Sequence, residues 1–370
     1  MIEPKESVKN TPPAHHGAFD YDELAQLGYS PDEVIDFSVN SNPYGTPPSV
    51  REAIASVPLD RYPDRECIAL RKKLAEHHNT NIENIVIGNG TAELLLLIAL
   101  AFIRPADKVL VVGPTFSEYE RVAKLMGADV NTFNARLNDR NEFFPPFQEI
   151  RTFIEEQQPR VAFMCNPNNP TGFTIYGRSV HNQFADTPLV VIDEAYVNFA
   201  SDLGLYKSIN FYWQQSPNLL MLRSLTKDFA IAGLRLGYAV GHPDVIEAIR
   251  RVRPAWNVNA MALAAGECIV GNSDLFPKED LYGDGMGLLL PEKAELVHNL
   301  EELGLTPVES KTHYFLVNVG DATAFRSKLL QHKIMVRDCT SFGLPQYVRI
   351  ATRTPEDNAK LLQAIEAIQA

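Results

Sequence analysis

The stretch MLRSLTKDFAIAGLRLGY, residues 221–238, decides the fold prediction for this chain. An apolar run ends in Ser224, Lys227 follows three positions later, and Arg235 lies eight residues further on. Lysine forms a Schiff base with an aldehyde once burial or a nearby cation makes it a free amine. Ser224 and Arg235 are side chains expected around a phosphate, one as a small donor and the other as a planar charged fork.

Together these residue types predict pyridoxal 5′-phosphate, held covalently at its aldehyde and electrostatically at its phosphate. Two other interpretations stay open at this point. Lys227 can be an exposed lysine that merely follows a strand, and Ser-x-x-Lys also matches a serine-hydrolase signature. Motifs elsewhere in the chain are needed to distinguish these three interpretations.

Length and composition limit the class of protein. With 370 residues, 45% of them hydrophobic, the chain can bury a large core and is long enough for two unequal domains. The net charge of −12 argues against nucleic acid and against an anionic membrane surface as partners. The four cysteines are far apart and form no Cys-x-x-Cys pair, so we expect no metal site and no disulfide framework, but isolated thiols in a reducing cytoplasm.

Targeting and membrane segments are not expected either. Residues 1–13 are charged, contain proline and lack an apolar core, unlike a signal peptide. The longest apolar run, residues 94–103, is too short to span a bilayer and suits a buried helix. We therefore expect a cytoplasmic protein.

A glycine turn opens the apolar helix. The predicted strand at 85–87 runs into Gly-Asn-Gly-Thr, and the helix follows at once. Bare backbone N–H groups at a helix N-terminus bind anions, so Gly90, Thr91 and Ala92 are expected to hold a phosphate.

Polar or aromatic residues also follow three more apolar runs. The runs are predicted strands at 109–112, 161–165 and 189–192. Phe116 can stack on a cofactor ring or belong to the core. Asn169 lies in the loop Asn-Pro-Asn-Asn-Pro-Thr-Gly, whose prolines leave its amides free to bind a ligand. Asp193 can keep a pyridinium nitrogen protonated, which makes the ring an electron sink, or it can be an ordinary helix cap.

From residue 260 the pattern changes to helices and shorter strands, which predicts a second domain. Strands are expected at 314–319 and 347–351, and helices at 291–303, 322–332 and 355–367. Arg337, Arg349 and Arg353 lie on or beside strands here, either as substrate-binding cations or as surface ion pairs. Residues 275–287 are rich in charge and glycine, which predicts a loop or a broken helix.

Taken in order, these motifs resemble fold-type I pyridoxal-phosphate enzymes, the aspartate aminotransferase superfamily. The matching motifs are an Asn-Pro turn, Tyr-Pro-Asp, Gly-Asn-Gly-Thr, Asn-Pro-Asn-Asn-Pro-Thr-Gly, Asp-Glu-Ala-Tyr, Ser-x-x-Lys, Gly-Leu-Arg and a late strand arginine, over nearly the full chain. The resemblance implies an α/β fold: a three-layer α/β/α large domain with a mostly parallel sheet, and a smaller α+β domain. We expect the large domain at 48–258 and the smaller, discontinuous one at 1–47 and 259–370.

The resemblance also implies residue roles. Lys227 is the Schiff-base lysine, Asp193 pairs with the ring nitrogen, Asn169 and Tyr196 bond the ring hydroxyl, and Phe116 stacks on the ring. Lys227, Asp193 and Tyr196 form the expected catalytic set. The implied phosphate contacts are Gly90, Thr91, Ala92, Ser224 and Arg235.

A homodimer and a small anionic substrate are implied as well. Tyr62, in the Tyr-Pro-Asp motif, looks like the tyrosine that reaches the phosphate bound by the partner subunit. The expected substrate contacts are His16, Gly17, Asn42, Arg337, Arg349 and Arg353. A pyridoxal-phosphate-binding regulator is disfavoured because no DNA-binding segment accompanies these motifs.

Two groups within the superfamily compete. Histidinol-phosphate aminotransferases share the Asn-Pro-Tyr-Gly turn, Tyr-Pro-Asp and Ala-Gly-Leu-Arg. Threonine-phosphate decarboxylases share more motifs with this chain. The shared motifs are similar to His-Gly, Asp-Phe-Ser-Val-Asn-Ser-Asn-Pro, Arg-Ser-Leu-Thr-Lys, Trp-Asn-Val-Asn, Val-Arg-Asp-Cys and Arg-Ile-Ala-Thr-Arg-Thr. The chain departs from the decarboxylase pattern at Ala18, where a glycine is usual, at Ala232, where proline is usual, and at 283–287. The tally favours the decarboxylase.

Overall fold

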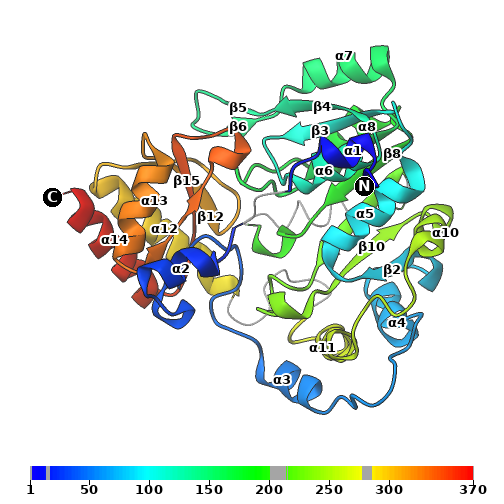
Figure 1. The fold of residues 1–370 in the computed structure, drawn as a ribbon, viewed down its shortest axis with the longest axis horizontal. Helices are drawn as coiled ribbons and strands as arrows, with labels where there is room; N and C mark the ends of the chain where they lie inside the picture. Colours follow the sequence, from blue (N-terminus) through cyan, green and yellow to red (C-terminus); the bar gives the residue numbers. More distant parts are fainter. Residues whose placement is uncertain (1, 14–16, 201–213, 215, 277–285, 370) are drawn as a thin grey trace.

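The computed structural model describes residues 2–13, 17–200, 214, 216–276 and 286–369. It confirms the expected α/β architecture: helices cover both faces of a large, mostly parallel sheet, and a smaller sheet with its own helices lies beside it (Figure 1). In the described part of the chain, no helix is long and apolar enough to cross a membrane.

The large sheet has seven strands in the order β2-β10-β9-β8-β7-β3-β4. Their bounds are Ile85–Gly88, Gly237–Gly241, Leu219–Ser224, Leu189–Asp193, Val161–Cys165, Lys108–Gly113 and Asp129–Asn134. Strand β10 pairs antiparallel with both β2 and β9, whereas the other neighbours are parallel. The sequence pattern predicts this strand at 235–240, but β10 begins two residues later because Arg235 has φ +59, a left-handed conformation that a strand residue does not adopt.

Strand β3 shows why the predicted strands read as continuous apolar runs. Leu110 and Val112 belong to one buried cluster, and Val109 and Val111 belong to the other. Successive side chains of a strand point to opposite faces, so a sheet covered on both faces needs apolar residues at every position.

Two sets of helices provide the cover (Figure 1). The first cluster takes buried residues from α3 (Pro48–Ala55), α4 (Ile68–His77), α7 (Phe147–Gln157), α8 (Gly177–Phe184) and α11 (Ala260–Val270). The second takes them from α5 (Gly90–Phe102), α6 (Glu118–Leu125) and α10 (Pro243–Val252). The smallest elements are α1 (Glu6–Lys9), the β5–β6 hairpin (Arg136–Leu137 and Phe143–Phe144), and the 3-10 turns η1 (Pro31–Glu33), η2 (Ile82–Asn84), η3 (Val197–Phe199), η4 (Ala232–Leu234) and η5 (Thr340–Phe342).

The smaller sheet has the order β11-β12-β15-β14, all antiparallel. Its strands are Thr306–Pro307, Tyr314–Asn318, Tyr347–Ala351 and Arg337–Asp338, and the helices beside it are α12 (Met286–Glu302), α13 (Ala322–Gln331) and α14 (Pro355–Gln369). The N-terminal segment joins this region: β1 (Ile35–Asp36) pairs with β13 (Ile334–Met335), Phe37 enters the same core, and α2 (Tyr21–Leu27) packs nearby.

The domain boundary predicted at residue 259 meets one difficulty. Helix α11 packs against α3 and α4, and its residues Ala262 and Ile269 belong to the core of the large sheet. That packing favours a boundary after α11; the division itself stays a prediction. Of the glycine-rich stretch, Gly287 lies in α12, and residues 277–285 lie outside the described residues.

Candidate active site

A pocket lies where the parallel strands of the large sheet end. It is lined by Thr91, Ala92, Phe116, Tyr119, Cys165, Asn169, Asp193, Ala195, Tyr196, Ser224, Thr226, Lys227 and Arg235. Most of the residues predicted to bind the cofactor are therefore brought together. The reason is topological, because parallel strands present their carboxyl ends at one edge of the sheet.

Lys227 is half-buried in this pocket. Burial lowers the pKa of its ammonium group to about 8, and the positive charges of Arg349 and Arg235 act in the same direction. A lysine with this pKa is a free amine in an appreciable fraction of molecules near neutral pH, as an attack on an aldehyde requires.

Asp193 ends β8 and is fully buried. Tyr119 Oη donates to Asp193 Oδ2 at 2.8 Å, and the Ala195 N–H donates to Oδ1 at 3.1 Å. Burial raises the pKa of the carboxyl to about 6, partly offset by these two donors. A cationic ring nitrogen placed against such a carboxylate would relieve the cost of burying its charge.

Tyr119 is a site residue that the sequence interpretation missed. It follows Phe116 by three residues at the start of α6, and the two rings meet edge-to-face with centroids 5.7 Å apart. The (i, i+3) spacing places both aromatic rings on one side of the turn. This spacing is the sequence feature from which Tyr119 could have been predicted as a site residue.

The phosphate end is built around a glycine. Gly90 has φ +77 and begins α5, and a Cβ added to it would lie 2.5 Å from Arg235 Nη2. Glycine is therefore required both by the backbone conformation and by the approach of the guanidinium. Ser224 Oγ lies 2.7 Å from Thr226 Oγ1 at the neighbouring strand end. N–H groups, two hydroxyls and a guanidinium fit the phosphate of pyridoxal 5′-phosphate.

Arg349 links the pocket to the smaller sheet. It is 5% exposed and donates through Nη1 to Asn169 Oδ1 and through Nη2 to the Ser38 carbonyl. Its Nε is buried and has no hydrogen-bond partner among the described residues. The Tyr314 ring lies 5.6 Å from the guanidinium carbon and also meets Tyr196 edge-to-face.

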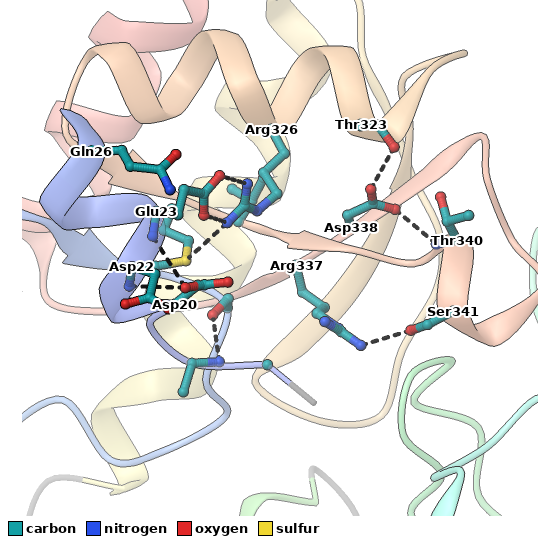
Figure 2. A pocket seen from close by; sticks show the side chains of 15 residues that line it. Asp20, Asp22, Glu23, Gln26, Thr323, Arg326, Arg337, Asp338, Thr340 and Ser341 are labelled. Carbon is teal, nitrogen blue, oxygen red and sulfur yellow. Dashed lines mark hydrogen bonds and ion pairs between the residues drawn. The ribbon is translucent and has the colours of Figure 1, made fainter. Parts of the chain in front are cut away.

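Arg337 and Gly17 line a second, larger pocket of about 680 Å³. Figure 2 shows Arg337 reaching toward Ser341, to which its Nη2 donates at 2.7 Å, while the Glu23–Arg326 ion pair lies on the opposite side. Ser38 also lines this pocket, and its carbonyl binds Arg349. Arg349 thus bonds one residue of each pocket: Ser38 of the larger pocket and Asn169 of the pocket around Lys227.

Arg353 and Tyr62 also lie outside the lining of the pocket around Lys227. Arg353 pairs with Asp357 at 2.8 Å and donates to the Asp36 carbonyl at 3.1 Å. These are the surroundings of a structural ion pair, and the substrate contact stays a prediction. Tyr62 is 78% exposed and stacks on Trp256 with centroids 4.7 Å apart.

Asn42 and His16 complete the predicted set. Asn42 is buried; its N–H donates to the Lys227 carbonyl and its Nδ2 to the Asp228 carbonyl, both at 2.9 Å. It therefore supports the lysine segment. His16 lies outside the described residues.

Comparison with known proteins identifies the family. Residues 32–365 match the model of aminotransferase class I and II. The chain belongs to the class I and II aminotransferase family. A histidinol-phosphate aminotransferase of Pseudomonas aeruginosa is 33% identical, with 94% of this chain and 93% of that protein covered. A protein of Caldanaerobacter subterraneus provisionally named threonine-phosphate decarboxylase is 32% identical, with 98% and 96% covered.

Solved structures share the fold. A histidinol-phosphate aminotransferase of Sinorhizobium meliloti in complex with pyridoxal 5′-phosphate superposes with a TM-score of 0.84 at 19% identity, covering 100% of this chain and 99% of that one. The L-threonine-O-3-phosphate decarboxylase of Porphyromonas gingivalis superposes with a TM-score of 0.76 at 24% identity, covering 91% and 99%.

Pyridoxal 5′-phosphate is the cofactor of this aminotransferase-family chain. Membership of the family and the cofactor complex among the structural neighbours agree with the groups that line the pocket. This excludes the serine-hydrolase interpretation of Ser-x-x-Lys.

Proposed function

We propose that the chain decarboxylates L-threonine O-3-phosphate. The bond from the α-carbon to the carboxylate breaks, carbon dioxide leaves, and one proton is added to the α-carbon to give aminopropanol phosphate. No keto acid is consumed. The established part is narrower: a pyridoxal-phosphate-dependent enzyme of the aminotransferase family.

One observation carries the proposal. Arg337 and Arg349 are directly paired across β14 and β15, so their side chains leave the same face of the smaller sheet. The charge of Arg349 lowers the pKa of Arg337, although burial is the larger cause. Two neighbouring cations repel each other unless anions lie between or beside them. Threonine phosphate has two anionic groups, a carboxylate and a phosphate, whereas histidinol phosphate has only its phosphate.

Roles within the site follow from this pairing. When bound, pyridoxal 5′-phosphate supplies an electron sink conjugated to the substrate's α-carbon. Arg349, next to Asn169, holds the substrate carboxylate, and Arg337 binds the phosphate. The Asp193 carboxylate keeps a proton on the ring nitrogen. Lys227 would hold the aldehyde of the cofactor, and its Nζ would donate a proton to the substrate's α-carbon after carbon dioxide has left.

A second candidate is histidinol-phosphate aminotransferase. It is favoured by the name of the Pseudomonas aeruginosa relative, which is as similar as the provisionally named decarboxylase. In that reaction Lys227 would remove the proton of the substrate's α-carbon, and 2-oxoglutarate would be required.

Product analysis separates the two candidates. Protein loaded with the cofactor is incubated with threonine phosphate alone and, separately, with histidinol phosphate and 2-oxoglutarate. We expect carbon dioxide and aminopropanol phosphate from the first mixture. Robust glutamate formation from the second, without carbon dioxide from the first, would reverse the assignment.

The proposed active form is a homodimer. The Tyr62 ring is exposed and lies outside the pocket of its own subunit, as expected for a residue that completes a partner's phosphate site. Mass measurement in solution with an activity assay at the same concentration tests this, and a fully active monomer would contradict it.

A further inference from the structure

Two carboxylates that the proposed chemistry does not use lie next to the site. Glu194 follows Asp193 at the end of β8, and Asp228 follows Lys227 beyond β9. Both acids are buried, at 1% and 3% exposure. Arg223 forms an ion pair with Glu194, and its positive charge also acts on Asp228. The charge of one guanidinium thus acts on two buried carboxylates.

Asp228 is held from two sides. Asn198, in η3, donates through Nδ2 to Asp228 Oδ2 at 2.6 Å. Asn42, from the N-terminal segment, donates its N–H to the Lys227 carbonyl and its Nδ2 to the Asp228 carbonyl. The N-terminal segment therefore holds the backbone at the lysine, and η3 holds the carboxylate that follows it.

The negative charge of Asp228 opposes folding. Burial raises the pKa of its carboxyl to about 7, although Asn198, Arg223 and Lys227 all favour the ionised form. Its Oδ1 has no hydrogen bond with any described residue. Asparagine has nearly the same shape and would avoid the burial of a charge. The carboxylate is therefore better explained by the site than by the fold.

Lys227 is the cation that this carboxylate can balance. The charged groups around the lysine are Arg349 of β15, Arg235 beyond η4, Asp36 of β1, Asp193 of the same pocket and Asp228 itself. The two arginines favour the neutral amine, whereas Asp228 and Asp36 favour the ammonium. Removal of Asp228 would shift this balance toward the amine.

We infer that Asp228 is a further positioning residue, whose buried carboxylate is the counter-charge to Lys227. Asn198 holds this carboxylate, and Asn42 holds the backbone carbonyls of Lys227 and Asp228. The inference rests on the role proposed for Lys227. The ammonium is the form that gives a proton to the substrate's α-carbon, so Asp228 supports the second half of the decarboxylation. The proton moves from Nζ to the α-carbon, and Asp228 does not touch the substrate.

The test uses cofactor-free protein, so that it does not depend on turnover. The rate at which acetic anhydride modifies Lys227 is measured by mass spectrometry from pH 6 to 10, and its midpoint reports the pKa of the lysine. Asp228→Asn is expected to lower that midpoint by about half a pH unit or more, because it removes a nearby opposite charge. Asp107→Asn is the matched control: Asp107 pairs with Arg160 at the amino-terminal end of β3, so the midpoint should not change.

Stability provides the second readout. A carboxyl whose pKa is raised on folding contributes stability that is present at low pH and lost as pH rises through about 7. Asp228→Asn should therefore unfold at a denaturant concentration equal to or higher than the wild type at pH 8. A purely structural residue would instead leave the lysine midpoint unchanged and lower stability.

A second variant protects the test if Asp228→Asn does not fold. Asn198→Ala keeps the carboxylate but removes a donor that favours its ionised form, so the Lys227 midpoint should fall in the same direction by less. An unchanged Lys227 midpoint in the folded variants would contradict the proposed role of Asp228 as a counter-charge. If borohydride fixes the cofactor on a different lysine, the role of Lys227 fails instead, and the two failures are distinguishable.

Discussion

The site has a cofactor half, the pocket around Lys227, and a substrate half, the region of the three predicted arginines. The two halves differ in how well the local sequence predicts which residues come together. In the cofactor half, predicted residues from Thr91 to Arg235 line one pocket at the ends of neighbouring strands. In the substrate half, three predicted arginines have three different surroundings: Arg349 beside Asn169, Arg337 in the second pocket, and Arg353 in an ion pair with Asp357. Residues at the ends of parallel strands must converge, whereas long side chains on an antiparallel sheet need not.

Removal of Lys227 should have the largest effect on turnover of all the substitutions considered. Lys227→Ala removes the only group expected to bond the cofactor covalently, and turnover should fall by about 10³-fold or more. The visible absorbance of lysine-bound cofactor should disappear, and borohydride should no longer fix a label on residue 227. A label found on another lysine of the wild-type protein would show that the cofactor half is wrongly assigned.

Asp193→Asn tests the electrostatics of the same half. The amide keeps the shape but cannot hold a proton on the ring nitrogen, so turnover should fall by about 10²-fold or more while the cofactor still binds. In cofactor-free protein, by contrast, the same substitution should raise the free energy of unfolding. Because burial raises the pKa of Asp193 to about 6, its contribution is lost as pH rises through 6, and the variant should be more stable at pH 8. Near-normal turnover would contradict the proposed electron sink.

Arg349→Ala measures the substrate half. Truncation of a buried cation that binds a substrate anion should cost about 2–5 kcal/mol in kcat/KM for threonine phosphate. Arg349→Lys keeps the charge but loses the fork that reaches Asn169 and Ser38, so most of the loss should remain. A kcat/KM within a factor of two of the wild type would remove Arg349 from the substrate site.

Arg353→Ala sharpens the contrast between the arginines. The sequence favours a substrate contact here, but the guanidinium pairs with Asp357 and lies over Phe37. We expect an unchanged KM for threonine phosphate and a loss of about 1 kcal/mol in the free energy of unfolding, because the pair is partly buried. A loss of several kcal/mol in kcat/KM would restore Arg353 to the substrate half.

The smallest effect is expected at Ala18, which lines the second pocket. Ala18 has φ +87, a conformation that glycine adopts without a steric cost. Ala18→Gly should raise the free energy of unfolding by up to about 1 kcal/mol and leave kcat unchanged. Chemical denaturation measures the first quantity. A decrease in stability would show that the alanine methyl group packs usefully here.

Some features were hidden from sequence reasoning because they depend on contacts between distant segments. Tyr119 enters the site through its bond to Asp193, although the sequence around it reads as an ordinary amphipathic helix. Asp228 reads as a charged residue in a loop, and only its burial and the hydrogen bond from Asn198 reveal it as a buried carboxylate. Helix α11 follows the predicted domain boundary, yet it completes the core of the large sheet.

The sequence by itself determined the α/β class, most strands of the large sheet and most of the cofactor half; the edge strand β4 was not predicted. Those features depend on local patterns: short apolar runs, glycine at a helix start, and polar residues just beyond each strand. The tertiary structure alone decided the strand order with antiparallel β10, the surroundings of the three arginines and the buried pairing of Asp228. Strand pairing and side-chain direction bring together residues more than a hundred positions apart, and no local pattern encodes which of them will meet.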